Sequence, residues 1–457
     1  MKDWHWHSLA LDGRSGSQVW QALYRDAAIT TLLESPSGTA GMATGPLTRY
    51  SVCAGPPRPG RLWTPALGEI LPFLRSGLAT AGSANAPAPD LPFTGGWLGW
   101  LGYDLAWELE KLPHLKADTL PFPVAYWYEP ESFAVLDHQL QILWLAATEL
   151  EDLERLSANL VNWVPQIAKV EQDLRSEVEE ARAVRLLTDQ TAFETLVSKA
   201  KAHIRAGDIF QANLSLRFES DYQGNGWSLY ERLYQINPSP FASYWRTPWG
   251  EVISASPERL VQLVGRRAQT RPIAGTRPRG LTLAQDQQLE HELIASAKES
   301  AEHVMLVDLE RNDLGRVCEW GSVQVDELLV VERYSHVMHI VSNVIGTLRP
   351  NISPIDLVGA VFPGGTISGC PKVRCLEIVE ALEPTRRSLF YGSCGYLDRR
   401  GYLDLNILIR TLLKVGSQVW GQVGAGIVAD SNPEREWQES LHKAQAQLLA
   451  LGARLPR

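Results

Sequence analysis

The sequence predicts an α+β protein in which mostly antiparallel sheets are layered against helices. Short apolar segments of the strand type alternate with loops rich in proline and glycine. Long helical patterns interrupt these strands without the regular strand–helix alternation of a doubly wound sheet. The 457 residues are 45% hydrophobic and 21% charged, as in an ordinary globular protein. Neither a Rossmann glycine motif nor a P-loop is present, so nucleotide chemistry has no support.

The first part of the chain predicts strands joined by irregular loops, because proline and glycine punctuate it at 55–60 and 84–89. Two helical stretches follow, one at 149–168 and a more charged one at 170–184. Composition changes at the end of the second stretch. We therefore expect a domain boundary near residue 185.

This boundary separates an N-terminal region, 1–185, from a second region, 186–457. The second region begins with an amphipathic helix at 192–206 and a strand at 208–219. A single long helix is expected at 289–307, where apolar residues recur at helical spacing. Three later segments have strand patterns: 392–396, 403–413 and 419–424.

The run at 270–280 has the composition of a pocket wall for an anion. Pro272 and Pro278 stiffen its ends, and Gly275 lets the main chain come close to a ligand. Thr276 would donate a hydrogen bond. Three arginines would add charge-assisted ones: Arg271, Arg277 and Arg279. An exposed basic loop is the alternative that these residues leave open.

Two pairs of glutamates have a spacing that suits a metal site. Glu299 and Glu302 lie three residues apart in the long predicted helix, and Glu436 and Glu439 repeat this spacing near the C-terminus. Residues at i and i+3 share a helix face, so each pair can aim two carboxylates at one point. Four converging carboxylates need a cation, and an oxygen-only ligand set favours Mg²⁺. Two solvated helix faces are the alternative.

Charge and cysteine content bound the partners and the compartment. A net charge of −9 argues against non-specific binding to nucleic acid or to an anionic membrane. Five cysteines, an odd number without a C-x-x-C pair, favour a reducing compartment. No signal peptide is visible, and no apolar run approaches the ~20 residues of a membrane span. We therefore expect a cytoplasmic protein.

Six further motifs follow one another from about residue 190 to the C-terminus: IFQANLS at 209–215, SASPE at 254–258, AEHVMLVDLERND at 301–313, PGGTISG at 363–369, CPKVR at 370–374 and GAGIV at 424–428. With the loop at 270–280, they resemble, in the same order, the motifs of the chorismate-utilising enzymes. That family includes anthranilate synthase component I, aminodeoxychorismate synthase component I, isochorismate synthase and salicylate synthase. The resemblance implies the family's layered α+β fold, chorismate as substrate and a chorismate-binding catalytic domain over 186–457.

The resemblance also implies the ligands of metal and substrate. Glu302 and Glu439 match the family's Mg²⁺ carboxylates most directly, with Glu299 and Glu436 close behind, and this metal meets the ring carboxylate of chorismate. The family's substrate-facing positions match Thr366, Lys372, Tyr391, Arg410, Gly424, Gly426 and Lys443. Arg410, Tyr391 and Lys443 would bind the enolpyruvyl carboxylate. In a strand as apolar as 403–413, Arg410 would be costly without an anionic partner. A structural salt bridge is the alternative.

Glu258 matches the family's general acid, which protonates the departing C4 hydroxyl. This role requires burial to raise its pKa. His339 matches a pocket histidine that contacts the leaving hydroxyl or assists the loss of pyruvate. Judged without the resemblance, Glu258 could cap a helix and His339 could be a core residue.

Gln211 separates the members of the family that add water from those that use ammonia. Water-adding members have a general-base lysine at this position, and an amide cannot activate water. Ammonia is therefore the expected nucleophile. The chain lacks a glutaminase Gly-x-Cys-x-Gly elbow, so the resemblance implies a separate glutamine amidotransferase subunit as partner.

The product is chosen from mixed signals. Ala274 replaces the loop lysine of many aminodeoxychorismate synthases, as in anthranilate synthases, and Leu33, Glu34 and Ser35 resemble the tryptophan-binding segment of the latter. Asn213 and the paired glycines of PGGTISG resemble aminodeoxychorismate synthase, as does the short overall length. We expect aminodeoxychorismate synthase component I, with anthranilate synthase component I as the alternative. A silent tryptophan sensor or amidotransferase scaffold is disfavoured by the retained acid, metal ligands and anion clamp.

Overall fold

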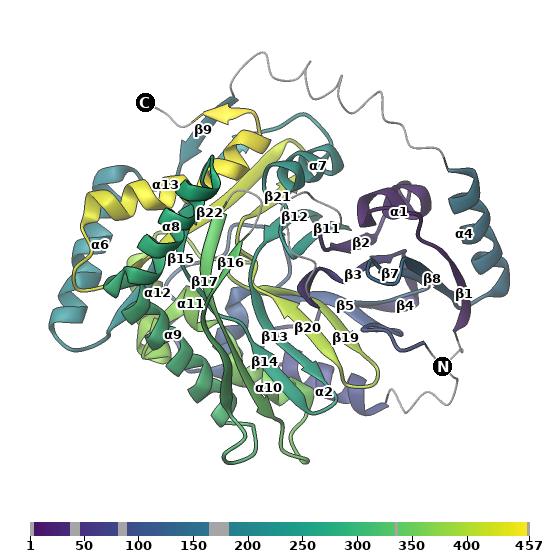
Figure 1. The fold of residues 1–457 in the computed structure, drawn as a ribbon, viewed down its shortest axis with the longest axis horizontal. Helices are drawn as coiled ribbons and strands as arrows, with labels where there is room; N and C mark the ends of the chain where they lie inside the picture. The colour runs from purple at the N-terminus through teal and green to yellow at the C-terminus, as the bar shows by residue number, and fades with distance from the viewer. Residues whose placement is uncertain (1–3, 37–45, 81–88, 164–181, 334–336, 455–457) are drawn as a thin grey trace.

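The computed structural model describes residues 4–36, 46–80, 89–163, 182–333 and 337–454 (Figure 1). Within them, two large sheets are layered with helices, which confirms the expected α+β class (Figure 1). The first sheet has 13 strands, in the spatial order β1 (His5–Ala10), β8 (Ile142–Ala147), β7 (Ser132–Asp137), β3 (Tyr50–Ala54), β2 (Thr30–Glu34), β11 (Phe241–Thr247), β12 (Gly250–Ser256), β21 (Thr411–Val415), β22 (Gln418–Ile427), β10 (Gln211–Asp221), β9 (Arg182–Leu186) and β23 (Ala453–Arg454), with β18 (Gly369–Cys370) beside β10.

The second sheet has 10 strands, in the order β15 (Ile273–Pro278), β17 (Val337–Thr347), β14 (Arg267–Thr270), β13 (Arg259–Val264), β20 (Leu403–Asn406), β19 (Ser393–Asp398), β5 (Gly96–Leu101), β6 (Ala125–Pro130) and β4 (Pro57–Trp63), with β16 (Gln324–Arg333) beside β17. The helices are α1 (Gly16–Tyr24), α2 (Ile70–Thr80), α3 (Ala106–Leu109), α4 (Leu150–Asn162), α6 (Gln190–Arg205), α7 (Gly226–Ile236), α8 (Leu283–Ala295), α9 (Ala297–Gly315), α10 (Pro354–Val361), α11 (Gly365–Ser368), α12 (Lys372–Leu382) and α13 (Pro433–Ala450), with short 3₁₀ turns at Pro46–Thr48 and Tyr103–Leu105.

An aromatic core joins the two sheets. Trp100 from β5 meets Trp245 from β11 edge to face, with ring centres 6.0 Å apart, and both rings are fully buried. Such contacts between large apolar side chains are the main stabilising term of a layered fold. This core packs β11 of the first sheet against β5 of the second, and Val252 of β12 belongs to the same cluster.

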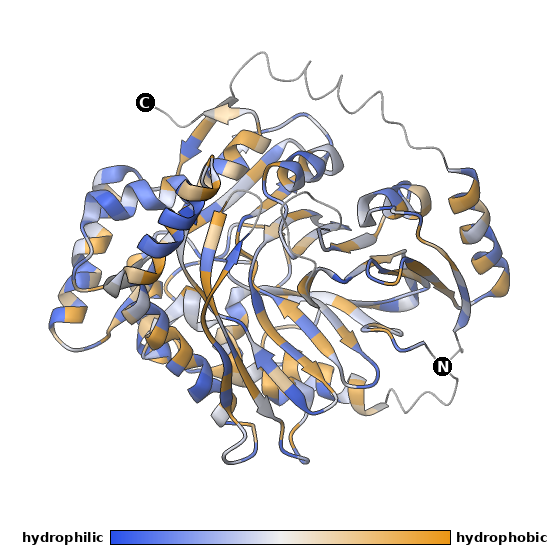
Figure 2. Cartoon of the chain, viewed as in Figure 1, coloured by the Kyte–Doolittle hydropathy of each residue, from blue (hydrophilic) through white to orange (hydrophobic). Residues whose placement is uncertain are grey.

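Helices cover the outer faces of both sheets. The first sheet packs against α1, α4, α6, α7 and α13, and the second against α8, α9 and α10. The covering helices mix hydrophilic and hydrophobic residues along their length (Figure 2). In α4, the buried residues Leu153, Leu156 and Leu160 recur at helical spacing, so one stripe faces the sheet.

Two expected elements are broken in the structure. The single helix expected at 289–307 is two helices, because the Ser296 side chain accepts a hydrogen bond from the backbone of Glu299 and starts α9 anew. The single strand expected at 403–413 splits into β20 and β21, which belong to different sheets. The connection between them, 407–410, carries Arg410, so the expectation that Arg410 lies within a strand is wrong.

The expected domain boundary lies inside a strand. Of the charged stretch at 170–184, only 182–184 are described, and they belong to strand β9 rather than to a helix. The helix expected at 149–168 is confirmed over α4, and 164–168 lie outside the described residues. Both sheets contain strands from each side of residue 185. The division at 185 therefore remains a prediction about the sequence.

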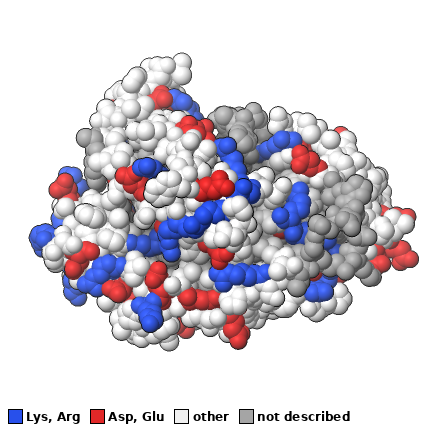
Figure 3. Space-filling model, turned by 90° about the horizontal axis from the view of Figure 1, so that it is seen from below, with Lys and Arg blue, Asp and Glu red and all other residues white. Residues whose placement is uncertain are grey.

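Two features of the surface bear on partners. No helix in the described ranges is long and apolar enough to span a membrane. Acidic and basic side chains are interspersed on the face shown in Figure 3, without one broad patch of a single sign.

Candidate functional site

The signature segment 270–280 contains strand β15, which pairs with β17 and is interrupted by a bulge. Its register shifts between Ala274 and Thr276, and Gly275 between them has a φ of +61°. A Cβ at Gly275 would lie 2.9 Å from Leu293 and 3.1 Å from a carboxylate oxygen of Glu299. Glycine is therefore required for the bulge and for its close approach to α8 and α9.

The bulge positions Thr276 against His339 of β17. The Thr276 hydroxyl lies 3.0 Å from His339 Nδ1, which is also 3.2 Å from the Gly275 carbonyl oxygen. Burial, with a smaller contribution from the nearby Arg410 guanidinium, lowers the pKa of His339 to about 4, against the raising effect of the Gly275 carbonyl. His339 is therefore neutral near pH 7. Ala274, also on β15, is buried and supplies no reactive group.

Glu258 stands just before β13, where the chain leaves the first sheet for the second. Its side chain is 5% exposed, and burial raises its pKa to about 7, against the opposing effects of the Thr366 hydroxyl and the Lys443 ammonium. The Ile407 amide donates to the Glu258 carbonyl at 3.0 Å and fixes the backbone. The expected rise in pKa is thus present, and a carboxyl of this kind can carry a proton near neutral pH.

Arg410 is a cation held without a protein anion. Its backbone has a φ of +52°, which is rare for a residue with a side chain. No ion pair or side-chain hydrogen bond of Arg410 occurs within the described ranges. Burial lowers the pKa of its guanidinium, with an opposing effect from Tyr391. The structural salt bridge considered above is therefore absent from that part of the chain, and Arg410 is available to an anion.

Tyr391 and Lys443 meet beside Gly424 of β22. The Tyr391 hydroxyl is buried and has no hydrogen-bond partner of normal geometry, and a Cβ at Gly424 would lie 2.9 Å from it. Lys443 Nζ donates to the Gly424 carbonyl at 3.0 Å and pairs with Glu439 at 2.8 Å. Thr366, on α11, accepts a hydrogen bond at its carbonyl from the Asn213 amide at 3.2 Å. Its hydroxyl is also buried without a partner of normal geometry.

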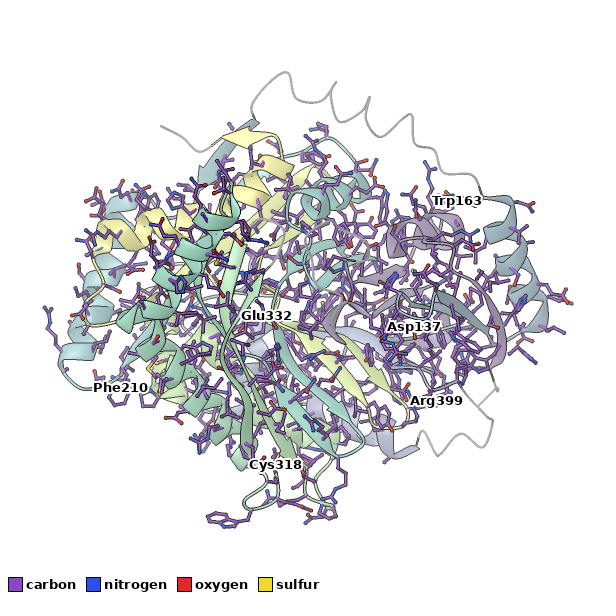
Figure 4. All side chains as sticks on the ribbon, in the orientation of Figure 1. Asp137, Trp163, Phe210, Cys318, Glu332 and Arg399 are labelled. Carbon is purple, nitrogen blue, oxygen red and sulfur yellow. The ribbon has the colours of Figure 1, made fainter. Side chains whose placement is uncertain are left out.

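Gln211 and Glu302 meet beside Gly426, two residues farther along β22. Gln211 Nε2 donates to Glu302 at 3.0 Å, while Gln211 Oε1 is buried without a partner. A Cβ at Gly426 would lie 2.4 Å from Gln211 Nε2, so glycine here lets the Gln211 amide keep its place beside Glu302. Phe210 is 68% exposed and lies at the outer edge of the molecule, so the Gln211 end of β10 reaches the surface (Figure 4).

The four expected metal ligands form two separate pairs. Glu299 and Glu302 lie on α9, where Glu299 contacts Arg277 at 3.4 Å, and Glu436 and Glu439 lie on α13. Glu436 is buried and Glu439 is exposed. Across the described part of the chain, no three His, Cys, Asp or Glu side chains form a group that could hold a metal ion. The carboxylates thus do not form a single ligand set in this conformation.

Two groups of cations that were expected to face an anion are paired with carboxylates of the protein. Each of the three arginines near the signature strand is paired with a carboxylate: Arg271 with Glu327 at 2.6 Å and Glu332 at 3.0 Å, Arg277 with Glu299 and Arg279 with Asp286 at 2.8 Å (Glu332 is labelled in Figure 4). Lys372 pairs with Asp313 at 2.7 Å and donates to the Val361 carbonyl. In this conformation the charges of these cations are matched by neighbouring carboxylates and are not left over for a substrate anion.

Comparison with known proteins settles the family. A family model described as a chorismate binding enzyme matches residues 43–449. The chain belongs to the chorismate-binding enzyme family.

Relatives of this family member carry two different names. It is 59% identical to an anthranilate synthase component I-like protein of Synechocystis sp. over 99% of this chain and 92% of that one. It is 44% identical to aminodeoxychorismate synthase component 1 of Bacillus subtilis, with coverage of 80% and 78%. It is 47% identical to anthranilate synthase component 1 of Thermus thermophilus, with coverage of 79% of each chain. The crystal structure of anthranilate synthase component I from Streptococcus pneumoniae superimposes with a TM-score of 0.75 at 31% identity, over 90% of this chain and 95% of that one.

One carboxyl beside Glu258 was missed from the sequence of this chorismate-binding enzyme. Glu310 of α9 is 6% exposed, and burial together with Asp313 and Glu258 raises its pKa to about 8, against the effect of Lys372. Its position follows the buried residues His303 and Val307 at helical spacing. An acidic residue at helical spacing from these positions was the sequence signal that could have identified Glu310 as a site residue.

The segment expected to bind tryptophan lines a separate pocket of about 650 Å³, counted to its open mouth. Leu33, Glu34 and Ser35 form part of its wall, with Arg259 and Asp404 on another side. The Glu34 carboxylate already accepts hydrogen bonds from Ser17, through its amide and its hydroxyl at 2.6 Å each, and from the Tyr230 hydroxyl at 2.7 Å. The Glu34 carboxylate is therefore held in the pocket wall by hydrogen bonds from other residues of the protein.

Proposed function

We propose that this chorismate-binding enzyme is aminodeoxychorismate synthase component I. It would aminate chorismate in a Mg²⁺-dependent reaction, with ammonia from a glutaminase subunit, to give 4-amino-4-deoxychorismate for 4-aminobenzoate and folate biosynthesis. The observation that carries amination is Gln211, whose buried Oε1 lacks a partner while Nε2 is bound to Glu302. An amide oxygen can accept a hydrogen bond from ammonia but cannot take a proton from water.

The site supplies the other roles that amination needs. Glu258, with its pKa of about 7, delivers a proton to the departing C4 hydroxyl, which leaves as water as the new C–N bond forms. Arg410 and the Tyr391 hydroxyl bind a carboxylate of chorismate, since Arg410 has no ion pair among the described residues and the Tyr391 hydroxyl has no hydrogen bond of normal geometry. Ammonia enters at the exposed end of β10, beside Phe210. A glutaminase subunit would dock near this opening.

Mg²⁺ is proposed on the chemistry of the donor set, two carboxylate pairs that flank the chorismate site. A bound Mg²⁺ would neutralise these carboxylates and the ring carboxylate of the substrate. Because the two pairs do not form one ligand set in this conformation, binding of metal and substrate would have to bring them together. Glu302→Gln and Glu439→Gln should each abolish turnover in a folded protein. Full activity of either variant, or of the wild-type enzyme in chelator, would contradict the metal assignment.

The choice of product rests on Asn213 and on Gly364 and Gly365. The Asn213 amide holds α11 through the Thr366 carbonyl, and a Cβ at Gly365 would lie 2.3 Å from Leu309. Both features fix how α11 presents Thr366 to the substrate. Anthranilate synthase component I is the second candidate, because Ala274 and the pocket beside Leu33 favour it.

Product analysis tests this choice. With chorismate, Mg²⁺ and ammonium, the purified chain should form 4-amino-4-deoxychorismate and release little pyruvate. Added aminodeoxychorismate lyase should then yield 4-aminobenzoate. Anthranilate fluorescence with an equal amount of pyruvate would make the chain an anthranilate synthase. No consumption of chorismate would favour a silent sensor or scaffold.

The pocket at Leu33 to Ser35 is proposed to bind tryptophan. Its wall combines apolar side chains such as Leu33 with the charged groups of Arg259 and Asp404, a mixture that suits an amino acid with an aromatic ring. Calorimetric titration with L-tryptophan should show saturable binding that Ser35→Trp abolishes, because the larger side chain would fill the pocket. Unchanged binding in that variant would mean that tryptophan binds elsewhere, and no binding to the wild type would mean that it does not bind at all.

A further inference from the structure

Arg387 lies behind the proposed chorismate site, in the connection between α12 and β19, and is 2% exposed. Its Nη1 donates to the carbonyl of Ile367 at 2.8 Å, and its Nη2 donates to the carbonyl of Asn213 at 2.6 Å. Ile367 belongs to α11, which carries Thr366, and Asn213 belongs to β10, which begins at Gln211. One guanidinium therefore joins two elements that form opposite parts of the site.

The same guanidinium supports Tyr391. Its central carbon lies 4.7 Å from the centre of the Tyr391 ring and 4.7 Å from that of Tyr103. A cation over an aromatic face is attracted to it, most strongly where water is excluded. Tyr391 has a φ of +65°, a conformation that a tyrosine adopts only where its surroundings impose it. Its unpartnered hydroxyl faces Gly424. The stacking contact thus holds a strained residue in the orientation that binding requires.

Glu383 fixes Arg387 from the other side. Its carboxylate accepts from Arg387 Nε at 3.0 Å and Nη2 at 2.7 Å, and also from the amide and hydroxyl of Ser215 at 2.7 and 2.8 Å. Ser215 lies opposite Gly424 in the ladder between β10 and β22. Burial lowers the pKa of Arg387, but the Glu383 carboxylate outweighs this effect and raises the pKa above its ordinary value. Arg387 therefore keeps its charge while it is buried.

We propose that Arg387, held by Glu383, is a positioning residue for chorismate binding, acting through Tyr391 and through the junction of α11 with β10. This inference rests on the proposed chorismate-dependent function, whichever amino product is formed. The competing explanation is a buried ion pair that contributes only to stability. The two explanations differ in whether substrate binding changes when the guanidinium is replaced.

Arg387→Lys separates them. Lysine keeps the charge and can bond Glu383, but it lacks the planar face and the fork that reaches two carbonyls. Arg386→Lys is the matched control, because Arg386 is 6% exposed, pairs with Asp104 at 3.0 Å and stacks over Trp107, yet contacts none of the site residues. We expect KM for chorismate to rise roughly tenfold in Arg387→Lys with kcat within about twofold. Arg386→Lys should lower Tm without changing KM.

A double variant tests the route through Tyr391. If Arg387 acts by orienting that hydroxyl, Arg387→Lys combined with Tyr391→Phe should raise KM no more than the larger single change does. Independent, additive effects on KM would overturn the route through Tyr391. Glu383→Gln serves if Arg387→Lys fails to fold, and it should also raise KM.

The wild-type enzyme distinguishes the failure of this inference from that of the proposed function. If the wild type consumes no chorismate, the proposed function fails. If the wild type turns over and the folded Arg387 and Glu383 variants keep a normal KM, the positioning role is overturned.

Discussion

The arginines of the signature segment and Arg410 form two contrasting regions of basic charge. Arg271, Arg277 and Arg279 lie close together in the sequence, and each forms an ion pair with a carboxylate of the protein. Arg410 stands in an apolar connection without any such partner in the described chain. This unused bonding capacity is why we propose Arg410 as the cation that binds the substrate anion. The density of basic residues along the sequence is a poor guide to such a cation.

The physical difference lies in where the opposing charges come from. Glu327 and Glu332 reach Arg271 from β16, which is far along the chain but adjacent in the sheet. Around Arg410 the neighbouring polar groups are the hydroxyl of Tyr391 and the neutral ring of His339. A partly buried guanidinium with neutral neighbours attracts an incoming carboxylate strongly, because little water competes for it. Four predictions follow from this contrast, ordered by the size of the expected effect.

The largest loss of activity should come from replacing Glu258, the proposed general acid. Glu258→Gln keeps the shape of the side chain but cannot deliver a proton, so turnover should fall by about 100-fold to 10,000-fold while chorismate binding persists. Steady-state rates together with calorimetric binding check both parts. Near-normal turnover would return Glu258 to a structural role.

Arg410→Met should separate binding from stability. Removal of a charge-assisted hydrogen bond to the substrate should lower kcat/KM by about 10- to 100-fold. Removal of an unpaired, partly buried cation should leave Tm unchanged or raise it. Kinetics and thermal unfolding of the same preparation test the opposite signs. A lower Tm with unchanged kcat/KM would mean that Arg410 is structural.

Much of this arrangement could be predicted from the sequence, and the rest depends on tertiary contacts. The layered fold, helix α6 and strand β10 follow from local patterns, and the motif at 424–428 indicated that Gly424 lies in a tightly packed place. Local patterns could not show the break at Ser296, because apolar spacing continues across a capping serine. They also could not show that the strand at 403–413 changes sheets. The pairing of Lys372 with Asp313 was likewise hidden, because it joins residues about sixty positions apart.

The pH dependence of the rate and of the free energy of unfolding gives a third test, which concerns the protonation of Glu258. Glu258 must be protonated to act, so above its pKa of about 7 the rate should fall roughly tenfold per pH unit at constant free ammonia. The folded pKa lies above the unfolded value, so the stabilising contribution is fully present below about pH 4.5 and is lost as pH rises through 7. This loss is on the order of 3 kcal/mol. Denaturant unfolding of Glu258→Gln should show a weaker pH dependence, and other carboxyls of raised pKa, among them Glu310 and Glu231, should contribute to the remainder. An unchanged dependence in that variant would assign the titration to other groups.

The smallest effect on activity should come from replacing an arginine of the signature segment, where each arginine is paired with a carboxylate. Arg277 is partly exposed and contacts Glu299 at 3.4 Å, a geometry in which an ion pair contributes about 0 to 1 kcal/mol. Arg277→Gln should therefore change KM for chorismate by less than about threefold. Because the variant frees the Glu299 carboxylate, the Mg²⁺ concentration for half-maximal activity should stay the same or fall. Assays alongside Arg410→Met provide the comparison. A loss of chorismate binding in Arg277→Gln as large as that in Arg410→Met would mean that the signature arginines do form the anion wall, and that their ion pairs open when substrate arrives.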